Sequence, residues 1–137
     1  MFPPTLLDAL GSEDEEICLD AMETLGDLLE YGDWTPEQAA PVLEALLRVV
    51  CVRQSATLQE VALNSLIIGF SRRNVIKIDM NELLECLGDL SSDIIPYALE
   101  LLGLSRTRTH LGVLKKYVSS ANSTISEAAM NAIIEIG

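Results

Sequence analysis

The sequence predicts an all-α protein in which four helical hairpins stack in a row as an α-solenoid. Apolar residues recur at helical spacing between prolines and glycines that mark segment ends, and alternating β-branched residues are nearly absent. An alanine-centred pattern also occurs four times along the chain. Because 137 residues are typical of one domain, we expect a single repeat domain over residues 1–137.

The repeated pattern places large apolar residues at fixed distances from an anchor alanine. The small alanine allows a neighbouring helix to approach closely, and the apolar residues around it seal the contact. The anchor alanines lie 41, 36 and 31 residues apart, so each period has room for two helices and a turn. The four copies are Ile17, Ala21, Met22, Leu25, Gly26; Leu58, Ala62, Leu63, Leu66, Ile67; Ile94, Ala98, Leu99, Leu102, Gly103; and Ile125, Ala129, Met130, Ile133, Ile134.

A partner helix is expected before each of these four helices, so that each repeat is a hairpin. Neither helix of a hairpin can bury its apolar face alone, and at least three stacked repeats are usually needed for stability. The expected partner helices are Pro3–Leu10, Pro36–Val52, Met80–Leu90 and Leu111–Ser119. The expected hairpins span about residues 3–32, 35–73, 79–105 and 109–137.

Helix starts are marked by capping patterns. In such a pattern, one polar side chain accepts a hydrogen bond from an unpaired backbone amide, and a Glu or Gln three residues later reaches back. Pro36 and Pro96 suit the first turns of their helices, where a missing N–H is tolerated. The expected pairs are Ser12 with Glu15, Thr35 with Gln38, Asp79 with Glu82, and Thr124 with Glu127.

The pattern is complete at Ile17 to Gly26 and at Ile94 to Gly103, and there it resembles the second helix of HEAT or HEAT-like repeats. The second and fourth copies have Ile67 and Ile134 in place of the glycine, which predicts less regular repeats. The resemblance covers nearly the whole chain. Since HEAT-like repeats form scaffolds, carriers and inhibitors, it implies an α-solenoid with a binding surface rather than a reaction.

The negative charge is concentrated in the first third of the chain. The net charge is -12, with 21 acidic and 9 basic residues, and residues 1–47 contain no Lys or Arg. Affinity for phosphate backbones is carried mainly by Lys and Arg, so we do not expect a nucleic-acid partner. The excess of acidic residues instead favours a basic protein partner.

Five acidic residues, here called the acidic stripe, follow steps of 4, 3, 4 and 3, which places them on one face of a helix. The stripe is either the solvated face of a terminal repeat or a surface that steers and holds a basic partner. Tyr31, Trp34 and Tyr97 are candidate exposed aromatic anchors for a partner, with a packed turn between repeats as the alternative for Trp34. The stripe consists of Glu16, Asp20, Glu23, Asp27 and Glu30.

We expect no catalytic, metal or cofactor site. His110 is the sole histidine, which excludes a zinc site with several imidazoles, and it is expected as a satisfied surface or capping residue. Cys18, Cys51 and Cys86 have the spacing of neither a disulfide framework nor a metal site, so buried free thiols are expected. The sequence also shows no phosphate-binding loop and no nucleophile elbow, so the chain is not expected to be an enzyme.

The sequence favours a cytoplasmic protein with no membrane partner. No apolar run approaches the roughly 18 residues of a membrane helix, and the first 47 residues lack the basic residues that begin a signal peptide. At the C-terminus, residues 134–137 follow a helix that a HEAT-like array would cover with another repeat or a cap. An exposed apolar face, a bound partner and a truncated chain all remain open there, as does the oligomeric state.

Three functions remain open, and all treat the chain as a binding protein. The first is an acidic inhibitor, such as a bacterial immunity protein, that masks a basic toxin; a nuclease suits this best because its active site is built to hold phosphate. The second is a general adaptor or scaffold for protein assembly. The third is a ligand-handling HEAT-like protein resembling phycobilin lyases, although no cofactor constellation is visible. The first is the principal expectation.

Overall fold

The computed structural model describes residues 2–72 and 77–137, and its secondary structure over these residues consists of helices without strands. The all-α prediction is therefore confirmed. The end of the second expected hairpin, at residue 73, lies outside the described residues. The chain divides into two compact units, Met1–Asp79 and Met80–Gly137, which are described separately below.

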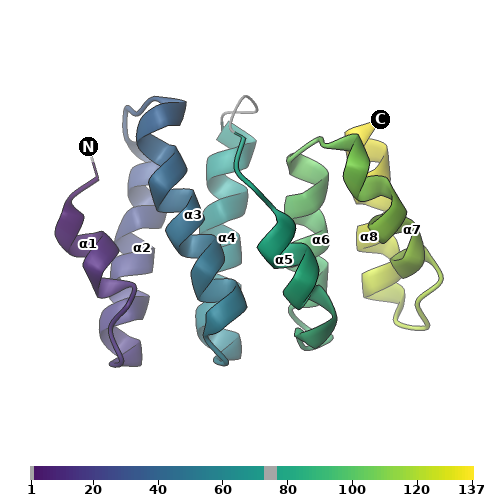
Figure 1. The fold of residues 1–137 in the computed structure, drawn as a ribbon, viewed down its shortest axis with the longest axis horizontal. Helices are drawn as coiled ribbons and strands as arrows, with labels where there is room; N and C mark the ends of the chain where they lie inside the picture. The colour runs from purple at the N-terminus through teal and green to yellow at the C-terminus, as the bar shows by residue number, and fades with distance from the viewer. Residues whose placement is uncertain (1, 73–76) are drawn as a thin grey trace. The chain divides into compact units, whose positions relative to one another are not determined.

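Unit 1 is built around the helix α4 (Ala56–Arg72), which packs against both α2 (Glu15–Tyr31) and α3 (Pro36–Val52). The short helix α1 (Pro4–Ala9) packs against α2. In Figure 1, α1 and α3 run antiparallel to α2 and α4, as expected for two hairpins. The bounds of α3 coincide with the expected partner helix 36–52.

Unit 2 is centred on α8 (Ser123–Ile136), which packs against α6 (Ile95–Leu104) and α7 (Leu111–Val118). The expected partner helix at 80–90 is shorter than predicted, because its second half is a turn of 3-10 helix. The remaining elements are α5 (Asn81–Cys86) and the 3-10 helices η1 (Leu87–Asp89) and η2 (Arg108–His110).

The capping prediction is confirmed in full at α3. The Thr35 hydroxyl accepts a hydrogen bond from the Gln38 amide at 3.2 Å, and Gln38 Oε1 accepts one from the Thr35 amide at 2.9 Å. Pro36 occupies the first turn of the same helix. These reciprocal bonds satisfy two donors that a helix start otherwise leaves unpaired.

The other three predicted caps are wrong by one or two residues. The Asp14 carboxylate, not Ser12, accepts from the first amides of α2, and the Asn122 side chain, not Thr124, does so for α8. Asp and Asn are among the strongest N-cap residues, and both stand directly before the first helical residue. At α5 the N-cap is Met80 rather than Asp79.

All four anchor alanines are buried, which confirms the expected alignment of the second helices. Ala21 is 3% exposed, and Ala62, Ala98 and Ala129 are fully buried. The apolar residue after the alanine is also fully buried in the first three copies. In the fourth copy Met130 is 45% exposed, so the last helix leaves part of this face uncovered.

Second helices approach each other closely at the glycine of the pattern. A Cβ atom added to Gly103 of α6 would lie 2.7 Å from the Cα atom of Ala132 in α8. A Cβ atom added to Gly26 of α2 would lie 3.0 Å from Ser65 Oγ in α4. The backbones of α6 and α8 therefore come close at Gly103, whereas Gly26 faces a small side chain.

The same contact is made at the same register in both units. Ser65 and Ala132 each lie three residues after an anchor alanine, and each receives the glycine of the preceding copy. The second and fourth copies, which have isoleucine instead of glycine, are the helices that supply the receiving small residue. In each pair of helices, one helix therefore supplies the glycine and the other supplies the small residue that faces it.

We predict that Gly103→Ala lowers the free energy of unfolding by about 1–3 kcal/mol, because the new methyl group meets the backbone of α8. Gly26→Ala should cost less, since the nearest atom there is a serine hydroxyl that can move. Urea unfolding measures both effects.

Gly112→Ala is the matched control, because no atom lies within 4 Å of a Cβ built at this helical position. It should raise the free energy of unfolding by roughly 0.5–1 kcal/mol, as alanine loses less backbone entropy on folding. Equal effects at Gly103 and Gly112 would show that the α6–α8 contact is not tight.

Candidate functional site

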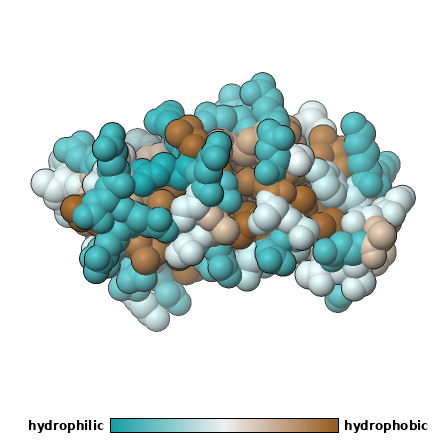
Figure 2. Space-filling view, turned by 90° about the horizontal axis from the view of Figure 1, so that it is seen from below, coloured by the Kyte–Doolittle hydropathy of each residue, from teal (hydrophilic) through white to brown (hydrophobic). Residues whose placement is uncertain are grey.

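The acidic stripe lies on the solvent-exposed face of α2. All five of its side chains are exposed, whereas the opposite side of the helix buries Cys18, Ala21, Met22 and Leu25. Figure 2 shows hydrophilic residues gathered at the left of the view, over the part of unit 1 where α2 begins. A single rigid helix therefore holds the five carboxylates at helical intervals with no need to order a loop.

Two arginines of unit 1 donate hydrogen bonds to backbone carbonyls. Arg72 Nη1 donates to the Leu29 carbonyl at 2.9 Å, and Arg53 Nη1 donates to the Leu10 carbonyl at 3.3 Å. Carbonyls at helix ends lack partners within the helix, so they attract such donors. The ion pair between Arg106 and Glu135 lies in unit 2, and none of the five stripe carboxylates is ion-paired with a described residue.

The three candidate aromatic anchors have different environments. Tyr31 is 77% exposed at the end of α2, directly after the last carboxylate of the stripe. Trp34 is 2% exposed; its Nε1 donates to the Leu29 carbonyl at 3.0 Å, and the Arg72 guanidinium lies 5.5 Å from its ring centre. The expectation of an exposed anchor at Trp34 is therefore wrong, because its indole packs in the turn after α2.

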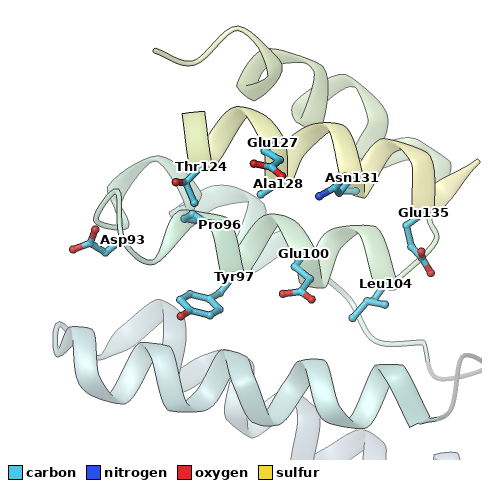
Figure 3. A pocket seen from close by; sticks show the side chains of 11 residues that line it. Asp93, Pro96, Tyr97, Glu100, Leu104, Thr124, Glu127, Ala128, Asn131 and Glu135 are labelled. Atoms are coloured by element: carbon cyan, nitrogen blue, oxygen red, sulfur yellow. The ribbon is translucent and has the colours of Figure 1, made fainter. Parts of the chain in front are cut away.

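The third aromatic residue, Tyr97, is half-buried and lines a groove in unit 2 between α6 and α8. The groove has a volume of about 560 Å³. In Figure 3 the two helices run side by side, and both contribute carboxylates to it. The residues that line it are Asp93, Pro96, Tyr97, Glu100, Leu104, Thr124, Glu127, Ala128, Asn131, Ala132 and Glu135.

The groove of unit 2 and the stripe of unit 1 occupy equivalent positions of the repeated helix. In each copy, the positions five and one before the anchor alanine and two and six after it point away from the core. In three of the copies these positions are Glu16, Asp20, Glu23 and Asp27 in α2; Asp93 in the turn before α6 with Tyr97, Glu100 and Leu104 in α6; and Thr124, Ala128, Asn131 and Glu135 in α8.

The sequence analysis missed the carboxylates of the groove. Asp93, Glu100 and Glu127 lie where acidic and basic residues balance overall, so charge summed over the chain does not reveal them. The signal that could have found two of them is the repeat itself, because Asp93 and Glu100 align with stripe residues. Counting charge by repeat position, rather than by chain segment, reveals both surfaces.

His110 is buried rather than on the surface, and it occupies the N-cap position of α7 without a capping hydrogen bond from its side chain. Its Nδ1 lies 3.2 Å from Ser105 Oγ, and that hydroxyl donates to the Leu102 carbonyl at 2.7 Å. Burial lowers the pKa of the His110 ring, and a hydrogen bond to the Leu102 backbone opposes this in part. The ring thus packs against the last turn of α6, where its contacts support the fold.

The cysteines are free thiols, as predicted, but only Cys18 is fully buried; Cys51 and Cys86 are half-buried. Burial raises the pKa of the Cys18 thiol, whose Sγ donates to the Leu10 carbonyl at 3.4 Å. A raised pKa keeps the sulfur protonated and therefore weakly nucleophilic.

Residues 2–72 and 77–137 show neither a metal-binding cluster nor a membrane-spanning helix. No three His, Cys, Asp or Glu side chains gather there in a way that would hold a metal ion. None of the helices there combines the length and apolar character needed to cross a membrane. No protein-family model matches the sequence, and no curated protein matches it significantly.

We predict that the free energy of unfolding decreases as the pH falls below 6.5, the ordinary pKa of histidine. The folded chain holds His110 with a lowered pKa, so the unfolded chain binds the proton first. Stability from this group is fully present above pH 6.5 and is lost, at up to about 1.4 kcal/mol per pH unit, as the pH falls towards the folded pKa.

Urea unfolding of the wild type and of His110→Gln, above and below this pH, checks the prediction. The variant should lose the part of the pH dependence that lies just below 6.5, because carboxylates titrate at lower pH. If the free energy of unfolding depended on pH equally in both proteins, that dependence would belong to groups other than His110.

Proposed function

We propose that this chain is a non-catalytic protein-binding module whose acidic stripe on α2 receives a basic protein partner. The observation that carries the proposal is the set of five exposed carboxylates on one helix, none of them in an ion pair with a described residue. Charges of one sign on a rigid backbone sum to a field that speeds the encounter with an oppositely charged surface. Tyr31 at the end of the stripe adds an exposed aromatic contact.

We further propose that the four hairpins form one α-solenoid of HEAT-like repeats. Burial of all four anchor alanines supports a shared register, and so does the glycine contact made alike in each unit. In such an array, equivalent helix positions present a continuous surface, and such surfaces serve binding.

The partner that best suits this surface is a basic toxin domain, most naturally a nuclease. A nuclease active site is built to hold phosphate, so carboxylates on a helix can imitate the charge of its substrate. The net charge of -12 agrees with a cytoplasmic inhibitor of the immunity-protein kind. A general adaptor would use the same surface, and a ligand-handling role like that of phycobilin lyases would require a cofactor instead.

Partner identity separates these roles. A neighbouring reading frame that encodes a secreted basic toxin would supply the partner directly, and affinity capture from the native host followed by partner identification is the alternative route. The purified partner should then lose its own activity when mixed with this chain in equal amounts. Binding without loss of activity would favour the adaptor.

We predict that reversing Glu23→Lys and Asp27→Lys together slows partner association by about tenfold or more at low salt. The wild-type rate should fall as salt rises, because the Debye length shortens from about 10 Å at 0.1 M to about 3 Å at 1 M. The thermal midpoint should stay equal or rise slightly, since opposite charges replace like charges beside Asp20 and Glu30.

The matched control reverses Asp8→Lys and Glu44→Lys, which are exposed residues of unit 1 outside α2. This control changes the net charge by the same amount and should retain most of the association rate. Wild-type binding by the Glu23 and Asp27 variant would show that the stripe is only a solvated helix face.

A further inference from the structure

We propose that the groove between α6 and α8 is a second binding site, which takes an extended segment of the partner rich in arginine or lysine and apolar residues. This inference rests on the proposed function, because it assumes a basic protein partner. It adds a site that the charge distribution of the sequence does not indicate, and it assigns that site a ligand chemistry.

Four of the residues that line the groove have aliphatic side chains. Pro96 and Leu104 come from α6, and Ala128 and Ala132 come from α8. The small alanines leave the space that larger side chains would fill. Arg and Lys have apolar stems that pack on such a surface while their charged heads stay in water.

The rim of the groove carries the charge that selects this ligand. Asp93, Glu100 and Glu127 are exposed lining residues, and none of them forms an ion pair within the described parts of the chain. Glu135 is already compensated by Arg106, whose Nη2 lies 2.8 Å from its Oε1. No Lys or Arg is among the described residues that line the groove, so its charge complements a cationic ligand.

Two other lining residues suit a peptide rather than a small ion. The ring of Tyr97 offers a face on which a guanidinium can stack. The amide of Asn131 can both donate to and accept from the backbone of an extended segment. A volume of about 560 Å³ is within the range of sites that enclose organic ligands and exceeds the needs of a single ion.

The test uses a fluorescein-labelled peptide of six alternating arginine and leucine residues and the full chain. Fluorescence anisotropy measures affinity, and chemical-shift changes in the ¹⁵N-labelled protein locate the peptide. We expect binding with shifts in α6 and α8. A peptide of alternating glutamate and leucine residues should not bind.

The groove variant carries Glu100→Lys and Glu127→Lys and should weaken peptide binding by about tenfold. The matched control carries Glu85→Lys and Asp89→Lys, which are exposed residues of unit 2 that do not line the groove, and it should change the affinity by less than about twofold. Neutral Glu100→Gln with Glu127→Gln provides a second variant if the reversed protein does not fold. Equal weakening by groove and control variants would overturn the proposal.

The aromatic and apolar parts of the site are tested separately. Tyr97→Ala should weaken binding about threefold, whereas Tyr97→Phe should retain it, because the ring face carries the contact. Spermidine, a small cation without apolar side chains, should bind much more weakly than the peptide. Equal affinity for spermidine and peptide would identify a small-cation site and overturn the proposal.

This test separates the groove from the stripe. Peptide binding is also measured on the protein with Glu23→Lys and Asp27→Lys, in which the stripe is disabled. Retained shifts in α6 and α8 would support the groove whatever the native partner does at α2. Shifts confined to α2 in the wild type would overturn the groove and leave the function proposed for the stripe intact.

Discussion

The close approach of second helices at small residues is the constraint on which the structure of each unit depends. At Gly103 the backbone of α6 lies so near Ala132 that even a methyl group would not fit, and Gly26 meets Ser65 in the same register. This contact sets the distance and the rotation of each helix pair. It thereby also determines which helix positions face outward.

The outward-facing helix positions carry the candidate binding residues of both units. On α2 they carry the five carboxylates of the acidic stripe, and between α6 and α8 they line a groove with both aliphatic and acidic side chains. One repeat register therefore produces two different acidic surfaces. The stripe is suited to long-range attraction, whereas the groove offers a concave surface with aliphatic side chains.

Interior polar groups have structural partners that account for them. The Trp34 indole donates to the Leu29 carbonyl, and the buried His110 ring lies against Ser105 at the end of α6. Burial removes these polar atoms from water, and the hydrogen bonds within the protein replace those to water. Without them, the unpaired buried groups would destabilise the fold. The five carboxylates of the acidic stripe, by contrast, form no ion pair with a described residue.

The sequence by itself determined the helical class, the four anchor alanines and the exposed face of α2, because these follow from periodicity along a single helix. It also placed the Thr35 capping box, a purely local interaction. Tertiary structure decided what depends on neighbouring helices: the burial of Trp34 and His110, the glycine contacts, and the groove that holds Tyr97 with Glu100 and Glu127. A groove forms between two helices, and the residues that line it lie some 30 positions apart in the sequence, so no local pattern can reveal it.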